Sequence, residues 1–241
     1  MSQVSNFSTP IQTVDPRWKD LYRLGFIVCA AFPVFILIAI IAYFIWPYSP
    51  GYTSVPDIFV DLQTNRLGGL MSLDLSVVVL MPVMILEMLA LYAALKQINE
   101  SYALIALVFG LMGAALWWVS KPLIEMVYVS NQFAAATSEI ERSQYLAAGE
   151  TLSAISSGTA WMLSQFLIAI SGGISSVLML RSKYFRRVTA YVGVTLAFLG
   201  ISFWIPEIGA FLSLLSTFGG VIWFALMARD FYRLAKMSVT E

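Results

Sequence analysis

The chain contains no histidine and only one cysteine, Cys29, among its 241 residues. The absence of histidine excludes bis-histidine haem, His-based zinc or iron sites, and nucleophiles activated by a Ser-His or Cys-His pair. A single cysteine cannot form a disulfide within the chain, and only carboxylates remain as ligands for a metal. The sequence therefore predicts no catalytic residues, no metal and no cofactor, and it favours a protein that is not an enzyme.

Charged residues are also scarce, at 12% of the chain, whereas apolar residues make up 59% and the mean hydropathy is +0.81. The formal net charge is zero, so nothing indicates a nucleic acid as partner. About 20 helical residues cross a bilayer core of roughly 30 Å, and the alternating ten-residue strands of a membrane barrel are absent. We expect an all-α membrane bundle in the lipid bilayer, formed as one domain by residues 1–241. Its six expected spans are 24–46, 71–95, 102–120, 152–180, 188–205 and 208–227.

The basic residues are concentrated in alternate hydrophilic segments between these spans. Short segments rich in Lys and Arg stay on the cytoplasmic side of a membrane. This pattern predicts six spans with both termini in the cytoplasm. Eleven of the 14 basic residues follow it: Arg17, Lys19, Arg23, Lys96, Arg181, Lys183, Arg186, Arg187, Arg229, Arg233 and Lys236.

The fourth span is rich in serine and glycine, with small residues spaced four apart, as in the pairs Ser171/Ser175 and Gly172/Ser176. Small residues at this spacing let helix backbones approach closely, which drives helix association inside lipid. A polar pore lining is the alternative interpretation. We favour helix packing for these residues.

Three ionisable residues are expected near the outer surface of the membrane. Asp74 lies near the outer end of the second span, and Lys121 lies at the outer end of the third apolar stretch, about 30 Å from its inner end. The two residues therefore reach the same depth on adjacent antiparallel helices. Glu125 shares a helix face with Lys121 at i, i+4 if Pro122 leaves that turn intact. We expect a polar cluster of Asp74, Lys121 and Glu125, either a structural clasp or a ligand or ion site.

Glu87 is the one acid expected deep in the membrane, about 12 Å from the inner end of its span. No basic residue is expected at its depth, and desolvation then favours the protonated carboxyl. Gln165, near the middle of the fourth span, is the expected hydrogen-bond partner. Three interpretations remain open for Glu87. They are a structural hydrogen bond, a proton-relay or cation site, and a lipid-edge position from which the side chain reaches toward water.

The loop signatures resemble those of one known family. The segment Leu-Tyr-Ala-Ala-Leu-Lys at 91–96 leads into Asn-Glu-Ser-Tyr-Ala-Leu at 99–104, and Ser-Gln-Tyr-Leu-Ala-Ala follows at 143–148. Together with the long fourth helix and the basic loop at 181–187, they resemble an uncharacterised family of prokaryotic six-helix membrane proteins, catalogued as a domain of unknown function. The resemblance implies a six-helix fold in a bacterial or archaeal plasma membrane. It implies no activity and no functional residue.

Three functions are compatible with these features. The first is a non-enzymatic structural or accessory membrane protein, with a membrane protein or a second copy of itself as partner. The second is a small transporter or channel that moves an ion or small solute along intramembrane carboxylates. The third, a lipid-modifying enzyme, needs a carboxylate pair that Glu87 alone does not supply. A polar cavity joining Asp74 and Lys121 to Glu87 and Gln165 would favour transport, whereas a dry interior would favour the accessory role.

Overall fold

A computed structural model describes residues 15–45 and 54–237 of the chain. All regular secondary structure in these residues is helical, so the expected all-α fold is confirmed. Two short 3-10 turns, at Pro16–Trp18 and Ser202–Trp204, accompany the α-helices. The α-helices are α1 (Lys19–Ile45), α2 (Val55–Thr64), α3 (Arg66–Ser72), α4 (Leu75–Leu95), α5 (Glu100–Val119), α6 (Leu123–Ala135), α7 (Glu139–Ser156), α8 (Thr159–Arg181), α9 (Arg187–Ile201) and α10 (Gly209–Met237).

Four helical segments within the described residues are long and apolar enough to cross a membrane. They are Pro16–Ile38, Val78–Leu95, Glu100–Ala135 and Glu139–Arg181. A fifth apolar helix, Arg187–Ile201, is shorter, and α10 extends over 29 residues. The prediction of long apolar helices is confirmed, whereas their location in a membrane and the number of six spans stay predictions.

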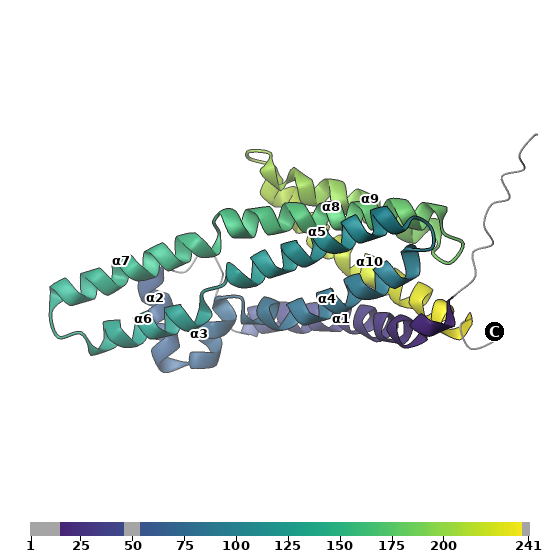
Figure 1. The fold of residues 1–241 in the computed structure, drawn as a ribbon. Helices are drawn as coiled ribbons and strands as arrows, with labels where there is room; N and C mark the ends of the chain where they lie inside the picture. The colour runs from purple at the N-terminus through teal and green to yellow at the C-terminus, as the bar shows by residue number, and fades with distance from the viewer. Residues whose placement is uncertain (1–14, 46–53, 238–241) are drawn as a thin grey trace, which may run out of the picture.

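Six helices close into a ring. Each of α1, α4, α5, α8, α9 and α10 packs against the next in this order, and α10 returns to α1. Figure 1 shows these helices running alongside one another in one part of the molecule. Their interior holds the main core, in which Tyr22, Met227 and Phe231 are almost completely buried. Helices that are apolar on every side suit this arrangement, because one face packs inside the ring and an apolar outer face is typical of membrane helices.

Small residues allow α5 and α8 to approach closely. A Cβ added at Gly110 would lie 2.8 Å from the Ser171 hydroxyl oxygen, and one at Gly113 would lie 3.0 Å from the Ser164 carbonyl. The Ser171 hydroxyl also donates a hydrogen bond of 2.6 Å to the Ala106 carbonyl across this contact. These contacts show close packing through the small residues of the fourth span.

The fourth span does not form one continuous helix over 152–180, as the sequence analysis expected. α7 ends at Ser156 and α8 begins at Thr159, with Ser157 and Gly158 between them. Serine and glycine are poor helix formers, so the chain breaks at this point with little loss of helix stability. Expected and observed bounds differ elsewhere too, since α9 ends at Ile201 and α10 continues to Met237.

The second span also starts later than expected. α3 ends at Ser72 and α4 begins at Leu75, so residues 71–74 do not belong to the long helix. Asp74 has a φ of 66° and a ψ of 32°, in the left-handed region. Aspartate tolerates this region better than most residues with a Cβ. This left-handed backbone conformation at Asp74 turns the chain from α3 into α4. The expected outer end of the first span, at residue 46, lies outside the described residues.

Helices α2, α3, α6 and α7 form an outer lobe beyond the ring (Figure 1). It has its own apolar core, in which Phe59 and Met126 are 1% and 0% exposed. The Gln63 amide donates to the Asn131 side-chain carbonyl at 2.9 Å and thereby joins α2 to α6. The chain is not helical at Lys121 and Pro122, so α6 is a separate helix from α5, and the turn that would place Glu125 beside Lys121 is not intact.

A capping box starts α7 in this lobe. The Ser138 hydroxyl accepts from the Glu141 backbone N–H, and the Glu141 carboxylate accepts from the backbone N–H groups of Thr137 and Ser138. These backbone donors hold the pKa of Glu141 below its ordinary value. The reciprocal bonds satisfy amides that a helix start otherwise leaves free, which explains why α7 begins here.

Pro82 lies inside α4 and cannot donate the backbone hydrogen bond that the Val78 carbonyl would otherwise receive. The indole N–H of Trp118, on α5, donates to this carbonyl at 3.0 Å. The neighbouring helix therefore satisfies a carbonyl that its own helix leaves without a donor. This bond also fixes α4 against α5 near the outer end of the ring.

Candidate functional site

A cavity of about 360 Å³ lies inside the ring. All six helices of the ring contribute to it, and its walls are mainly aliphatic and aromatic. Along α4 its lining extends from Leu80 to Leu95, which corresponds to about 22 Å of helix. One wall residue from each helix illustrates its character: Phe32, Met84, Leu107, Ile168, Leu196 and Phe224.

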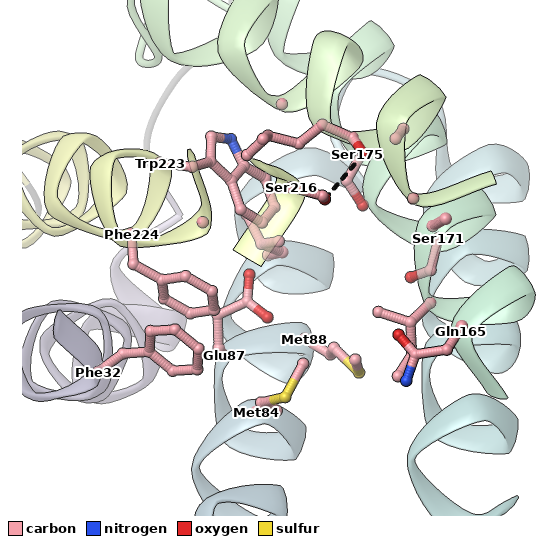
Figure 2. A pocket seen from close by; sticks show the side chains of 18 of the residues that line it. Phe32, Met84, Glu87, Met88, Gln165, Ser171, Ser175, Ser216, Trp223 and Phe224 are labelled. Atoms are coloured by element: carbon pink, nitrogen blue, oxygen red, sulfur yellow. Dashed lines mark hydrogen bonds between the residues drawn. The ribbon is translucent and has the colours of Figure 1, made fainter. Parts of the chain in front are cut away.

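Glu87 enters this cavity from α4. It is 3% exposed, and it shares a helix face with Met84 and Leu91, which also line the cavity. Its Oε1 atom is buried and has no hydrogen-bond partner among the described residues. Figure 2 shows its carboxyl group beside the rings of Phe32 and Phe224. These rings stack with centroids 3.7 Å apart. The cavity therefore contains a buried carboxyl oxygen to which no described residue donates.

Gln165 lines the same cavity but forms no hydrogen bond with Glu87 within the described structure. The expected Glu87–Gln165 bond is therefore wrong. In Figure 2 the two side chains lie on different walls, with Met88 between them in the view. The physical reason is the order of the ring, in which α5 lies between α4 and α8. The two polar groups face the same space without touching.

The outer ionisable residues form a pair, not a cluster of three. Lys121 Nζ lies 2.6 Å from Asp74 Oδ2, and the lysine side chain is only 8% exposed. Glu125 is exposed on α6 and has no ion pair or hydrogen bond with any described residue. Its inclusion in the cluster was wrong because Pro122 interrupts the helix between Lys121 and Glu125. The pair ties the start of α4 to the end of α5 where the ring meets the outer lobe.

The two polar sites are separate. Neither Asp74 nor Lys121 lines the cavity that contains Glu87. The outermost cavity residue on α4, Leu80, lies six residues inside Asp74, which is about 9 Å along a helix. The lining of this cavity therefore does not extend to the outer pair.

The structure also reveals a buried acid that the sequence analysis overlooked. Asp230, on α10, is 0% exposed and accepts from the Thr189 hydroxyl at 2.6 Å and the Arg186 backbone N–H at 3.2 Å. The available signal was its position three residues after Met227 and four before Leu234, which places it on the buried face of α10.

No group of three or more His, Cys, Asp or Glu residues in the described part of the chain is arranged to hold a metal ion. Comparisons with models of protein families, with curated proteins and with solved structures find no match. The central cavity and its carboxyl group are therefore the observations from which a function can be argued.

Proposed function

We propose that the chain is an integral membrane protein that crosses the plasma membrane of a prokaryote six times, through α1, α4, α5, α8, α9 and α10. We also propose that it belongs to the six-helix family that its loop segments resemble. Contacts between the basic segments support a common inner side. Lys96 Nζ lies 3.8 Å from the centroid of a Trp18 ring, and Asp230 accepts from the Arg186 backbone N–H. The positive-inside rule then assigns this end, with both termini, to the cytoplasm.

Labelling of single cysteines tests this orientation. In a chain whose Cys29 is replaced by serine, we expect an impermeant maleimide to label Ser143→Cys, on α7, in intact cells. Gln97→Cys, between α4 and α5, should react only after lysis. Both wild-type side chains are exposed, so access to the reagent decides the result. The reverse pattern would show that the orientation is inverted.

The function we propose is non-enzymatic: an accessory membrane protein that holds a small, largely apolar molecule inside the ring. The observation that carries this proposal is the cavity of about 360 Å³ that contains one unpartnered carboxyl oxygen. Protein interiors are close-packed, and few of their voids exceed the size of a water molecule. Ligand pockets have volumes of about 300–1,000 Å³, mostly apolar walls and a small number of polar groups. The cavity has these properties.

Transport along a polar path has less support. That function requires the outer pair and the buried acid to face one aqueous route, whereas Asp74 and Lys121 lie outside the cavity lining. Mainly apolar walls also offer a hydrated ion few oxygen ligands. Binding therefore explains the geometry better than conduction does.

A neutral apolar probe tests the binding function. We expect tert-butylbenzene to raise the midpoint temperature of unfolding of the purified full chain, because a ligand that binds only the folded state stabilises it. Gly220→Leu should abolish this rise. Gly220 lines the cavity, and a Cβ added there meets nothing within 4 Å, so leucine fills the space without a clash at its Cβ.

Gly172→Leu is the matched control for this experiment. An added Cβ at Gly172 also meets nothing within 4 Å, but this residue does not line the cavity. The control variant should keep the full thermal response, and partitioning of the probe into detergent affects all variants equally. A response that is the same in wild type and Gly220→Leu would refute binding in the cavity.

A further inference from the structure

Over the described residues, the lining of the cavity includes one acidic side chain and no basic one to neutralise it. Glu87 is the one acidic or basic side chain among the described residues that line it, and the lining contains no lysine or arginine. We propose that the cavity binds a lipophilic monocation, an organic ammonium ion with an apolar body, and that Glu87 is its counter-ion. This inference rests on the proposed function, because it names the class of molecule that the cavity holds.

The burial of the Glu87 carboxyl group without a charged partner supports a cationic ligand. A charge buried away from water is tolerated only when it is paired, and otherwise the group becomes neutral. Glu87 is 3% exposed, and its Oε1 atom has no partner among the described residues. A ligand with a positive charge supplies the missing partner, whereas a hydrocarbon leaves the oxygen unsatisfied and an anion is repelled.

The walls beside Glu87 suit an organic cation. Phe32 and Phe224, which line the cavity together with Glu87, stack on each other, and Trp223 lies close to Phe224, with ring centroids 5.6 Å apart (Figure 2). Aromatic faces attract ammonium groups, most strongly where water is excluded. The thioether of Met84 adds a polarisable apolar surface. An ammonium head can therefore contact the carboxylate and ring faces together, while its apolar body occupies the rest of the cavity.

A metal ion fits the cavity less well. Hard cations require about six oxygen ligands, and no cluster of three acidic or other metal-binding residues is present in the described structure. Gln165 lies on another wall, and the Ser171 hydroxyl already donates to the Ala106 carbonyl. These oxygens do not converge on Glu87. The geometry therefore favours an organic cation, whose charge is surrounded by apolar groups and needs few oxygen ligands.

Protons compete with such a ligand, because Glu87 cannot be neutralised by a proton and paired with a cation at the same time. Two other titratable groups belong to its surroundings, Cys29 on α1 and Tyr92 on α4. From α5, α8, α9 and α10, no acidic or basic side chain among the described residues lines the cavity. Cation binding should therefore tighten as the pH rises from mildly acidic to mildly alkaline, whereas binding of a neutral molecule should not change.

Two probes of the same shape isolate the charge: the trimethylphenylammonium ion and its uncharged analogue, tert-butylbenzene. Each is titrated against the purified full chain, with wild type, Glu87→Gln, Gly220→Leu and Gly172→Leu compared. We expect Glu87→Gln to weaken binding of the cation at least about tenfold and to remove its pH dependence. Binding of tert-butylbenzene to this variant should be unchanged, which also shows that the variant is folded. Gly220→Leu should lose both probes, and Gly172→Leu should keep both.

The outcomes separate this inference from the proposed function. If tert-butylbenzene binds in the cavity but the cation does not, or binds Glu87→Gln equally well, the cation assignment is wrong and the binding function stands. If neither probe binds the wild type, both proposals fail. Should Glu87→Gln not fold, the wild-type pH dependence decides, because a pH-independent affinity for the cation contradicts Glu87 as counter-ion.

Discussion

Replacing Asp230 with alanine is expected to lower the free energy of unfolding of the chain by about 3 kcal/mol. Asp230 is fully buried; its Oδ2 accepts hydrogen bonds from the Thr189 hydroxyl and the Arg186 backbone N–H, and its Oδ1 lies 3.6 Å from the Arg229 guanidinium. Alanine would leave both donors without this partner where the start of α9 packs against the C-terminal part of α10. An unsatisfied buried donor costs its full desolvation free energy, which explains the size of the expected loss.

Two further variants distinguish the effect of losing the hydrogen-bond acceptor from the effect of losing side-chain volume. Asp230→Asn keeps one carbonyl oxygen of similar shape and should lose less than the alanine variant. Thr189→Val removes only the hydroxyl donor and should cost about 1 kcal/mol. Reversible unfolding in mixed micelles with increasing denaturing detergent, followed by circular dichroism, measures all three. Wild-type stability in Asp230→Ala would contradict an anchoring role for this acid.

Replacing Gly193 with valine is expected to lower the free energy of unfolding by about 1–3 kcal/mol. A Cβ at this position of α9 would clash with the Ser176 hydroxyl and lie 2.6 Å from Trp223 Nε1. Trp223 cannot move without weakening its hydrogen bond of 3.1 Å to the Thr189 carbonyl. The substitution therefore separates α8, α9 and α10 at one point, and tryptophan fluorescence should shift with the loss of packing.

Gly220→Val is the matched control for this variant. Gly220 also lines the cavity, but an added Cβ there meets nothing within 4 Å. The same unfolding titration should place its stability near that of wild type. Equal losses in both variants would show that the effect comes from valine in a membrane helix and not from the contact at Gly193.

Helix content and the relative depth of residues could be predicted from the sequence, because both depend on composition and on the fixed rise of a helix. The short connection between α4 and α5 makes these helices antiparallel neighbours. Counting residues along each of them then brings Asp74 and Lys121 to the same level, where the structure pairs them. Glu125 was assigned wrongly for a local reason, since Pro122 separates it from the turn that contains Lys121.

Contacts between helices distant in the chain could not be predicted in this way. Glu87 and Gln165 were expected to bond because their depths agree, but depth does not reveal the order of helices around the ring. Asp230 was overlooked because charges were counted by segment and not by helix face. The packing of the outer lobe could not be predicted either, because it depends on contacts of α2 with α6 and α7, which are distant in the chain.

The hydrogen bond from Trp118 to the Val78 carbonyl has a consequence for how this protein can change over evolutionary time. The carbonyl needs an outside donor because position 82 is proline. In a descendant with an ordinary residue at 82, the helix supplies its own donor, and phenylalanine can replace Trp118 at no loss of hydrogen bonding. The reverse order of changes passes through an intermediate with an unpaired carbonyl in lipid. Tryptophan should therefore be retained at position 118 wherever position 82 is proline, and the proline should be lost before the tryptophan.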